Sequence, residues 1–152
     1  MKKLIALLLA VCFSGVVSLP AFAATSDDAP EEEFATVELV ETFDISEKQA
    51  FLDPELYASV DSLFKGTQDL TTARMTTLWS SNSSKYGSIS CYNNGDTDSG
   101  QGAVRFIING KIQDVAAGQG ATFRVTSGRR VVISAQALWY DGTYDLEVVA
   151  AK

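Results

Sequence analysis

The chain has 152 residues, with 12 lysines and arginines, 19 aspartates and glutamates and no histidine, and its formal net charge is −7. The absence of histidine excludes Ser-His-Asp and Cys-His catalysis and most zinc sites, because these use imidazole as base or ligand. The acidic balance argues against a nucleic-acid partner, since such binding needs a basic surface.

Residues 1–23 have the three parts of a secretory signal peptide. A positive start with Lys2 and Lys3 precedes an apolar stretch, and the small side chains of Ala21 and Ala23 form a cleavage site. The apolar stretch is shorter than the roughly 20 residues that a membrane span needs. We therefore expect cleavage after Ala23, a secreted protein of the extracellular space or cell envelope, and no stable membrane anchor after cleavage.

The two cysteines fall on either side of this cleavage site. Cys12 lies within the apolar stretch, and the valine before it is a poor residue for the lipid attachment of bacterial lipoproteins, so we expect Cys12 to be removed. Cys91 is then the one cysteine of the mature chain, which excludes an internal disulfide. A lone cysteine on a strand is typical of a small buried apolar residue.

Residues 24–45 are predicted to form a flexible acidic leader, because its beginning contains almost no large apolar side chain. Within this leader, residues 34–43 could form a strand. The following segment, residues 46–70, contains a helical signal: Asp53 as N-cap, a proline at the first helical position, apolar side chains at helical spacing, and Gly66 at the C-terminal end. It predicts a short amphipathic helix over residues 54–65 that packs on the domain.

From Thr71 onward the sequence changes to short alternating segments separated by turns. Seven strands are predicted there, at residues 72–80, 86–93, 102–108, 112–117, 120–126, 129–139 and 143–150. Their spacing indicates an all-β domain over residues 71–152. We expect a small antiparallel β-sandwich, immunoglobulin-like or related, with about seven strands, one short N-terminal helix and the flexible acidic leader.

The turn Asn109-Gly110 is typical of a two-residue hairpin and fixes a register. It sets Arg105 opposite Asp114 as a surface ion pair and Ile107 opposite Ile112 on the same outer side. We expect the predicted helix to cover these two isoleucines.

Two further hairpins are predicted in the last third of the chain. A three-residue turn ending at Gly128, in the left-handed conformation, would pair residues 121–125 with 129–133. The turn Asp141-Gly142 would pair the last two strands. The second register places Trp139 inward, opposite Tyr144, as a cross-strand aromatic pair. Ile133, Leu146 and Val148 lie on the same inward face in this register.

The stretch from Val115 to Val125, continued by Gly142 to Val148, is similar to generic bacterial extracellular β-sandwich modules of the immunoglobulin-like or prepeptidase type. The resemblance covers a small part of the chain and consists of alternating strands joined by glycine turns. It implies a fold of that class, and no functional residue is carried over.

One loop contains candidate metal ligands. Asn94, Asp96 and Asp98 alternate as the oxygen ligands of a calcium loop do. The position that would hold a bidentate glutamate is Arg105, and asparagine, aspartate and glycine are also ordinary turn residues. We therefore expect a solvated turn and no cofactor, with calcium binding by this loop as the alternative.

Trp79 and Tyr140 are the candidate ligand-binding residues. We expect aromatic rings of this domain to pack in the core or at its rim, and the alternative is that exposed rings stack against a sugar. Asp145 and Glu147 could form a carboxylate pair for acid–base chemistry, although their spacing is also typical of a solvated strand. The basic pair Arg129-Arg130 could be the place where the acidic leader folds back.

No catalytic residue is predicted. We expect a secreted, non-enzymatic bacterial β-sandwich protein, a binding or accessory module for a surface, an extracellular protein or a polysaccharide. Two alternatives stay open. A carboxylate-based extracellular hydrolase would need two acids in one cleft, and a self-assembling structural protein would use exposed edge strands such as residues 72–80.

Overall fold

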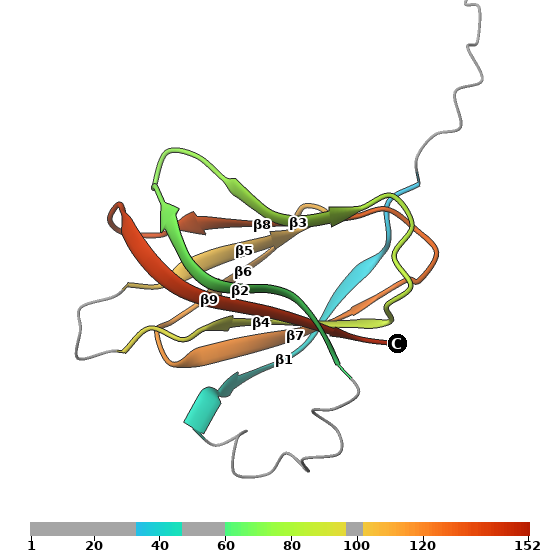
Figure 1. The fold of residues 1–152 in the computed structure, drawn as a ribbon, viewed down its shortest axis with the longest axis horizontal. Coiled ribbons are helices and arrows are strands. Elements are labelled where there is room, and N and C mark those ends of the chain that lie inside the picture. The colour runs from blue at the N-terminus through green and yellow to red at the C-terminus, as the bar shows by residue number, and fades with distance from the viewer. Residues whose placement is uncertain (1–32, 47–59, 97–101) are drawn as a thin grey trace, which may run out of the picture. The chain divides into compact units, whose positions relative to one another are not determined.

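The computed structural model describes residues 33–46, 60–96 and 102–152, which form nine strands in two antiparallel sheets (Figure 1). The five-stranded sheet consists, in spatial order, of β1 (Val37–Asp44), β7 (Gln119–Val125), β4 (Ser88–Asn93), β9 (Gly142–Ala151) and β2 (Asp61–Leu70). The four-stranded sheet consists of β3 (Thr76–Ser81), β8 (Val131–Ala137), β5 (Val104–Ile108) and β6 (Lys111–Val115). The predicted β-sandwich is confirmed, with nine described strands in place of about seven.

The predicted signal peptide and the leader up to residue 32 lie outside the described residues. Within the described ranges, no helix is long and apolar enough to cross a membrane. The strand predicted over residues 34–43 is confirmed as β1, so this part of the leader belongs to the sheet.

Along the chain from β2 to β9, the four pairs of strands are nested one inside another. β5 pairs with β6, β4 with β7, β3 with β8 and β2 with β9, each time antiparallel. This part of the chain is therefore one long hairpin rolled into two sheets, which is the jelly-roll arrangement among the related β-sandwiches. β1 lies outside the nested set and pairs with β7. Because β1 and β2 both precede Thr71, the sandwich begins earlier in the chain than residue 71.

The core lies between the two sheets, where alternate side chains of both point inward. Its largest fully buried members include Tyr144, Phe106, Phe123, Leu70, Ile89 and Ile108. Cys91 on β4 lies among them with no exposed area, as a free thiol. The prediction that Cys91 is a small buried apolar residue is thus confirmed.

The predicted helix over residues 54–65 is wrong in its described part. Asp61–Leu70 is a strand, β2, that pairs with β9, and residues 54–59 lie outside the described residues. A bulge between Ser62 and Phe64 turns both Leu63 and Phe64 towards the core, which imitates the apolar spacing of a helix. Pairing with β9 therefore decides the conformation over local helical signals.

The hairpin at Asn109-Gly110 is confirmed in every pair of its register. Both turn residues have positive φ, 48° and 84°, as a type I′ turn requires. Arg105 forms two hydrogen bonds with Asp114, at 2.7 and 2.9 Å, so the predicted ion pair is present. The helical cover over Ile112 is wrong, because this side chain is 53% exposed.

The other two predicted hairpins are wrong. β7 and β8 lie in different sheets, and so do β8 and β9. Gly128 has the predicted left-handed conformation, with φ of 78°, but its turn arches from one sheet to the other. The connection between β8 and β9 does the same (Figure 1). Trp139 therefore does not face Tyr144 from a paired strand.

Candidate functional site

Residues 138–141 connect β8 to β9 and form an arch from one sheet to the other. Among the described residues, this arch carries two neighbouring aromatic side chains that are both strongly exposed. Trp139 is 65% exposed and Tyr140 is 50% exposed. The prediction that Trp139 points into the core is wrong, because the arch leads the chain out of one sheet before it enters the other. Tyr140 is exposed as the sequence predicts.

Both rings of this pair rest on the backbone of Gly102. A Cβ atom placed on Gly102 would lie 3.2 Å from Cζ of Tyr140 and 3.4 Å from Cε3 of Trp139. A side chain at this position would therefore press on both rings. Gly102 was not singled out from the sequence, where it is one of several glycines in a turn-rich loop.

Hydrogen bonds hold the arch from three sides. The buried Tyr144 hydroxyl donates to the Tyr140 carbonyl oxygen at 2.8 Å. Asp141 Oδ1 accepts from the Thr72 amide at 2.7 Å and from its hydroxyl at 3.0 Å. The Leu138 amide donates to the Ala103 carbonyl oxygen at 3.1 Å. The exposed rings are thus carried by a fixed backbone.

Asn93 fixes the support beneath the rings. Its side chain is fully buried, and Nδ2 donates to the carbonyl oxygens of Gly102 at 3.0 Å and Val115 at 3.2 Å. Its Oδ1 accepts from the Gly95 amide at 3.3 Å. Asn93 therefore ties together both ends of the loop that precedes β5. The sequence analysis names residues of that loop as candidates, and Asn93 is not among them.

We name the exposed rings of Trp139 and Tyr140, with Gly102 beneath them, the aromatic platform. The calcium candidates belong to the loop that leads to it. The Asn94 amide donates to the Asp145 carbonyl oxygen at 2.9 Å, and Asp98 lies outside the described residues. Within the described ranges, no three acidic or cysteine side chains gather as metal ligands. Calcium binding therefore stays an untested alternative to the solvated turn.

Trp79, the other candidate, is not part of the platform. It is half-buried on β3, packs against the core, and its ring centroid lies 6.1 Å from that of Tyr86. The Tyr86 hydroxyl donates to Asp61 at 2.7 Å, and Lys85 forms an ion pair with the same carboxylate at 2.9 Å. The hydrogen bonds from Lys85 and Tyr86 lower the pKa of Asp61. This cluster joins β2 to the turn before β4.

The other features singled out from the sequence lie elsewhere. Glu147 forms an ion pair with Lys65 at 3.2 Å across β9 and β2, so it is already engaged by a neighbouring strand. Arg129 forms an ion pair with Glu33, and the Arg130 guanidinium lies 5.2 Å from the centre of the Phe34 ring. The described end of the acidic leader does fold back on this basic pair.

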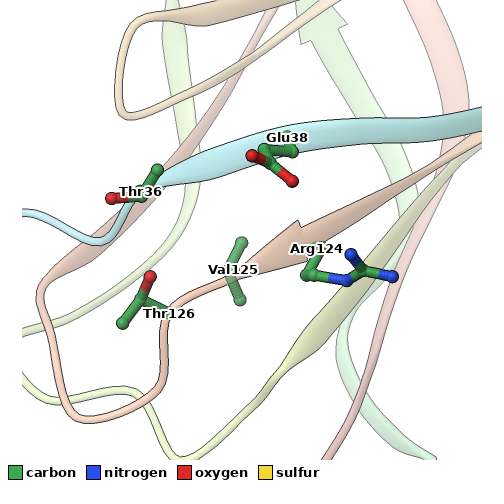
Figure 2. A pocket seen from close by; sticks show the side chains of 5 residues that line it. All are labelled: Thr36, Glu38, Arg124, Val125 and Thr126. Carbon is green, nitrogen blue, oxygen red and sulfur yellow. The ribbon is translucent and has the colours of Figure 1, made fainter.

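A shallow hollow of about 190 Å³ lies between β1 and β7 (Figure 2). Its lining consists of Thr36, Glu38, Arg124, Val125 and Thr126. Glu38 and Arg124 are register partners on the two strands. The hollow therefore offers one carboxylate, one guanidinium and two hydroxyl groups. Its lining lacks the second carboxylic acid that a carboxylate-pair hydrolase would use.

Comparisons with family models, with curated proteins and with solved structures found no match to this chain. Function is therefore inferred from the geometry of the site.

Proposed function

We propose that the protein is a secreted, non-enzymatic binding module that holds an extracellular polysaccharide on its aromatic platform. The observation that carries this proposal is the exposure of Trp139 and Tyr140 on a backbone held by hydrogen bonds. Large apolar rings are costly to leave in water, so a fixed exposed pair favours a binding role.

A sugar fits this platform better than a deep apolar ligand would. Pyranose rings have faces of C–H groups, which bury well against the electron-rich faces of aromatic rings. Hydroxyl groups at the ring edge need polar partners, and Asp141 and Thr72 lie at the same arch. A platform already fixed by hydrogen bonds loses little conformational entropy on binding, which favours affinity.

The charge of the surroundings selects among glycans. Asp141 directly follows Tyr140 in the arch, and its carboxylate accepts both hydrogen bonds from Thr72. A carboxylate next to the rings disfavours polyanions and leaves a neutral or amino-bearing polysaccharide as the preferred ligand.

Co-sedimentation with insoluble neutral and amino-bearing polysaccharides, namely cellulose, mixed β-glucan, chitin and chitosan, tests the proposal. At least one should retain the protein, and Trp139→Ala and Tyr140→Ala should each weaken retention about tenfold or more, which corresponds to about 1.4 kcal/mol. Phe34→Ala is the matched control, because this ring is also exposed but lies against Arg130, before β8, whereas the platform follows the other end of that strand. Retention that both platform variants preserve would refute the proposed site.

Export is tested separately. Mass spectrometry of the protein from the extracellular or envelope fraction of its source should give a chain that begins at Ala24. A chain that retains residues 1–23 in the cytoplasm would contradict the secreted part of the proposal and leave the platform measurement unaffected.

A further inference from the structure

The described sandwich has four edge strands, and one of them differs from the rest. β1 and β2 bound the five-stranded sheet, and β3 and β6 bound the four-stranded sheet (Figure 1). Edge strands expose unpaired backbone groups, and charged side chains commonly protect them from pairing with other chains. Three of the four have such residues: Glu38, Glu41 and Asp44 on β1, Asp61, Lys65 and Asp69 on β2, and Lys111 and Asp114 on β6.

β3 has no such protection. Thr76–Ser81 contains no charged residue and no proline, and its composition of threonine, leucine, tryptophan and serine favours a strand. The protective feature that the described residues do provide is a bulge between Thr77 and Trp79 in the pairing with β8. No residue of the strand is fully buried, and Met75 immediately before it is 61% exposed.

We propose that β3 pairs antiparallel with β3 of a second copy of this chain and joins the two four-stranded sheets across a two-fold axis. Such an axis places each strand opposite itself, so like charges meet wherever a strand carries mainly one sign. On β1, every charged residue is acidic, and self-pairing would bring these carboxylates together. β3 is the edge on which self-pairing brings no charge repulsion in any register.

The two-fold arrangement has a consequence for the aromatic platform, and this consequence rests on the proposed function. Thr76, where β3 begins, pairs with Ala135 near the end of β8, so β3 starts at the end of the sandwich that carries Trp139. Antiparallel pairing of two copies therefore places their platforms at opposite ends. A dimer of this form would bridge two polysaccharide chains.

Sedimentation velocity of the mature protein from micromolar to about millimolar concentration tests the association, because a small edge interface is expected to be weak. A dimer fraction should appear and rise with concentration. Thr77→Lys and Ser80→Lys place a charge at exposed positions of β3 and should each raise the dimer dissociation constant about tenfold or more.

Thr42→Lys is the matched control, since it makes the same substitution at an exposed position on a different edge strand, β1. It should leave the dissociation constant unchanged. Thermal melts of all three variants verify that the fold is retained. A protein that stays monomeric over the whole range overturns the proposal, and so does a dimer that Thr42→Lys weakens as much as Thr77→Lys does. Neither result bears on polysaccharide retention, which a monomer can also show.

Discussion

The Tyr144 hydroxyl donates a hydrogen bond to the carbonyl oxygen of Tyr140 at 2.8 Å, and this bond joins the core to the aromatic platform. Tyr144 is 2% exposed and is the largest fully buried side chain of the described residues, whereas the Tyr140 ring is half in solvent. The bond spans the arch between the two sheets. The position of the exposed ring therefore depends on a side chain that is fixed by core packing.

Tyr144→Phe removes this bond and keeps the ring that fills the core. We expect the free energy of unfolding to fall by about 0.5–1.5 kcal/mol, the usual net contribution of one hydrogen bond. Urea unfolding measures this loss. Tyr144→Phe should also weaken polysaccharide retention more than Tyr86→Phe does. The Tyr86 hydroxyl likewise donates a hydrogen bond, but Tyr86 lies away from the platform. Equal effects of the two variants on retention would show that the bond does not position Tyr140.

Asn93→Ala should destabilise the fold, because it removes the hydrogen bonds that hold Gly102 under the platform. It removes two donated hydrogen bonds and one accepted bond, and it leaves the carbonyl oxygens of Gly102 and Val115 without this partner. Buried groups that lose a partner cost about 1–3 kcal/mol each, so we expect a loss of roughly 2–4 kcal/mol in chemical unfolding. Asn94→Ala is the control, since the bond described for Asn94 is made by its backbone amide. A loss of the same size in Asn94→Ala would contradict this role of Asn93.

The sequence allowed the inward faces of the strands to be predicted better than their partners. Ile133, Leu146 and Val148 are all buried, as the alternation of the last two strands predicts. The hairpin that was built on the same alternation is wrong. In a sandwich, two strands that face each other across the core show the same inward pattern as two strands that pair side by side. Alternation alone therefore cannot distinguish an arch from a hairpin.

The Asn109-Gly110 hairpin was predictable because a type I′ turn needs positive φ at two successive positions, and asparagine and glycine adopt it at low cost. The Asp141-Gly142 sequence is similar, but Gly142 does not adopt positive φ there. The side chain of Asp141 instead accepts hydrogen bonds from Thr72, a residue distant in the chain. A contact between distant segments thus determines the conformation of this turn, and the local sequence cannot indicate such a contact.

The incorrect hairpin at Asp141-Gly142 also explains why the sequence identifies only one of the two rings of the platform. The sequence predicts that Tyr140 is exposed, whereas the incorrect hairpin places Trp139 inward. One signal could have identified Asn93: the alternation of β4 puts it on the inward side, after Ile89 and Cys91, where an amide needs buried partners. Gly102 could not be identified, because its role depends on two rings that approach from another segment.

Gly120→Ala should weaken the docking of β1. A Cβ atom at this position would lie 2.5 Å from Cζ of Phe43 and 3.1 Å from Cδ1 of Tyr92, so the Phe43 ring must move. Phe43 also packs edge-on against Tyr92, with ring centroids 5.6 Å apart, and this contact would be lost. We expect a loss of about 1–3 kcal/mol in thermal or urea unfolding, as in other overpacked sites.

Two further variants isolate the cause of that loss. Gly87→Ala is the matched control, because a Cβ atom there meets a first neighbour at an ordinary 3.7 Å, and its effect should be small. Phe43→Ala removes the ring that clashes. In Phe43→Ala, adding Gly120→Ala should then cost less than it does in the wild type, which is a positive coupling in a double-mutant cycle. Additive losses would show that the Phe43 ring is not the obstacle.

Alkaline pH should destabilise the fold partly through Cys91. Burial raises the pKa of this thiol, so the folded protein keeps the proton where an unfolded chain has lost it. A thiol in an unfolded chain ionises near pH 8.5. Above that pH the unfolded state binds fewer protons than the folded state, and the free energy of unfolding therefore falls as the pH rises.

Cys91→Ala removes this contribution. Between pH 7 and pH 10 the wild type should lose about 2 kcal/mol more than the variant does, as measured by urea unfolding at each pH under reducing conditions. The variant is less stable at every pH, since it leaves a cavity in the core, so the comparison uses the pH-dependent loss and not the absolute value. Burial also raises the pKa of Tyr144, and the hydrogen bond to Asp61 raises the pKa of Tyr86, but both tyrosines are present in the two proteins. Parallel pH profiles for wild type and Cys91→Ala would show that Cys91 ionises as readily in the folded protein as in the unfolded chain.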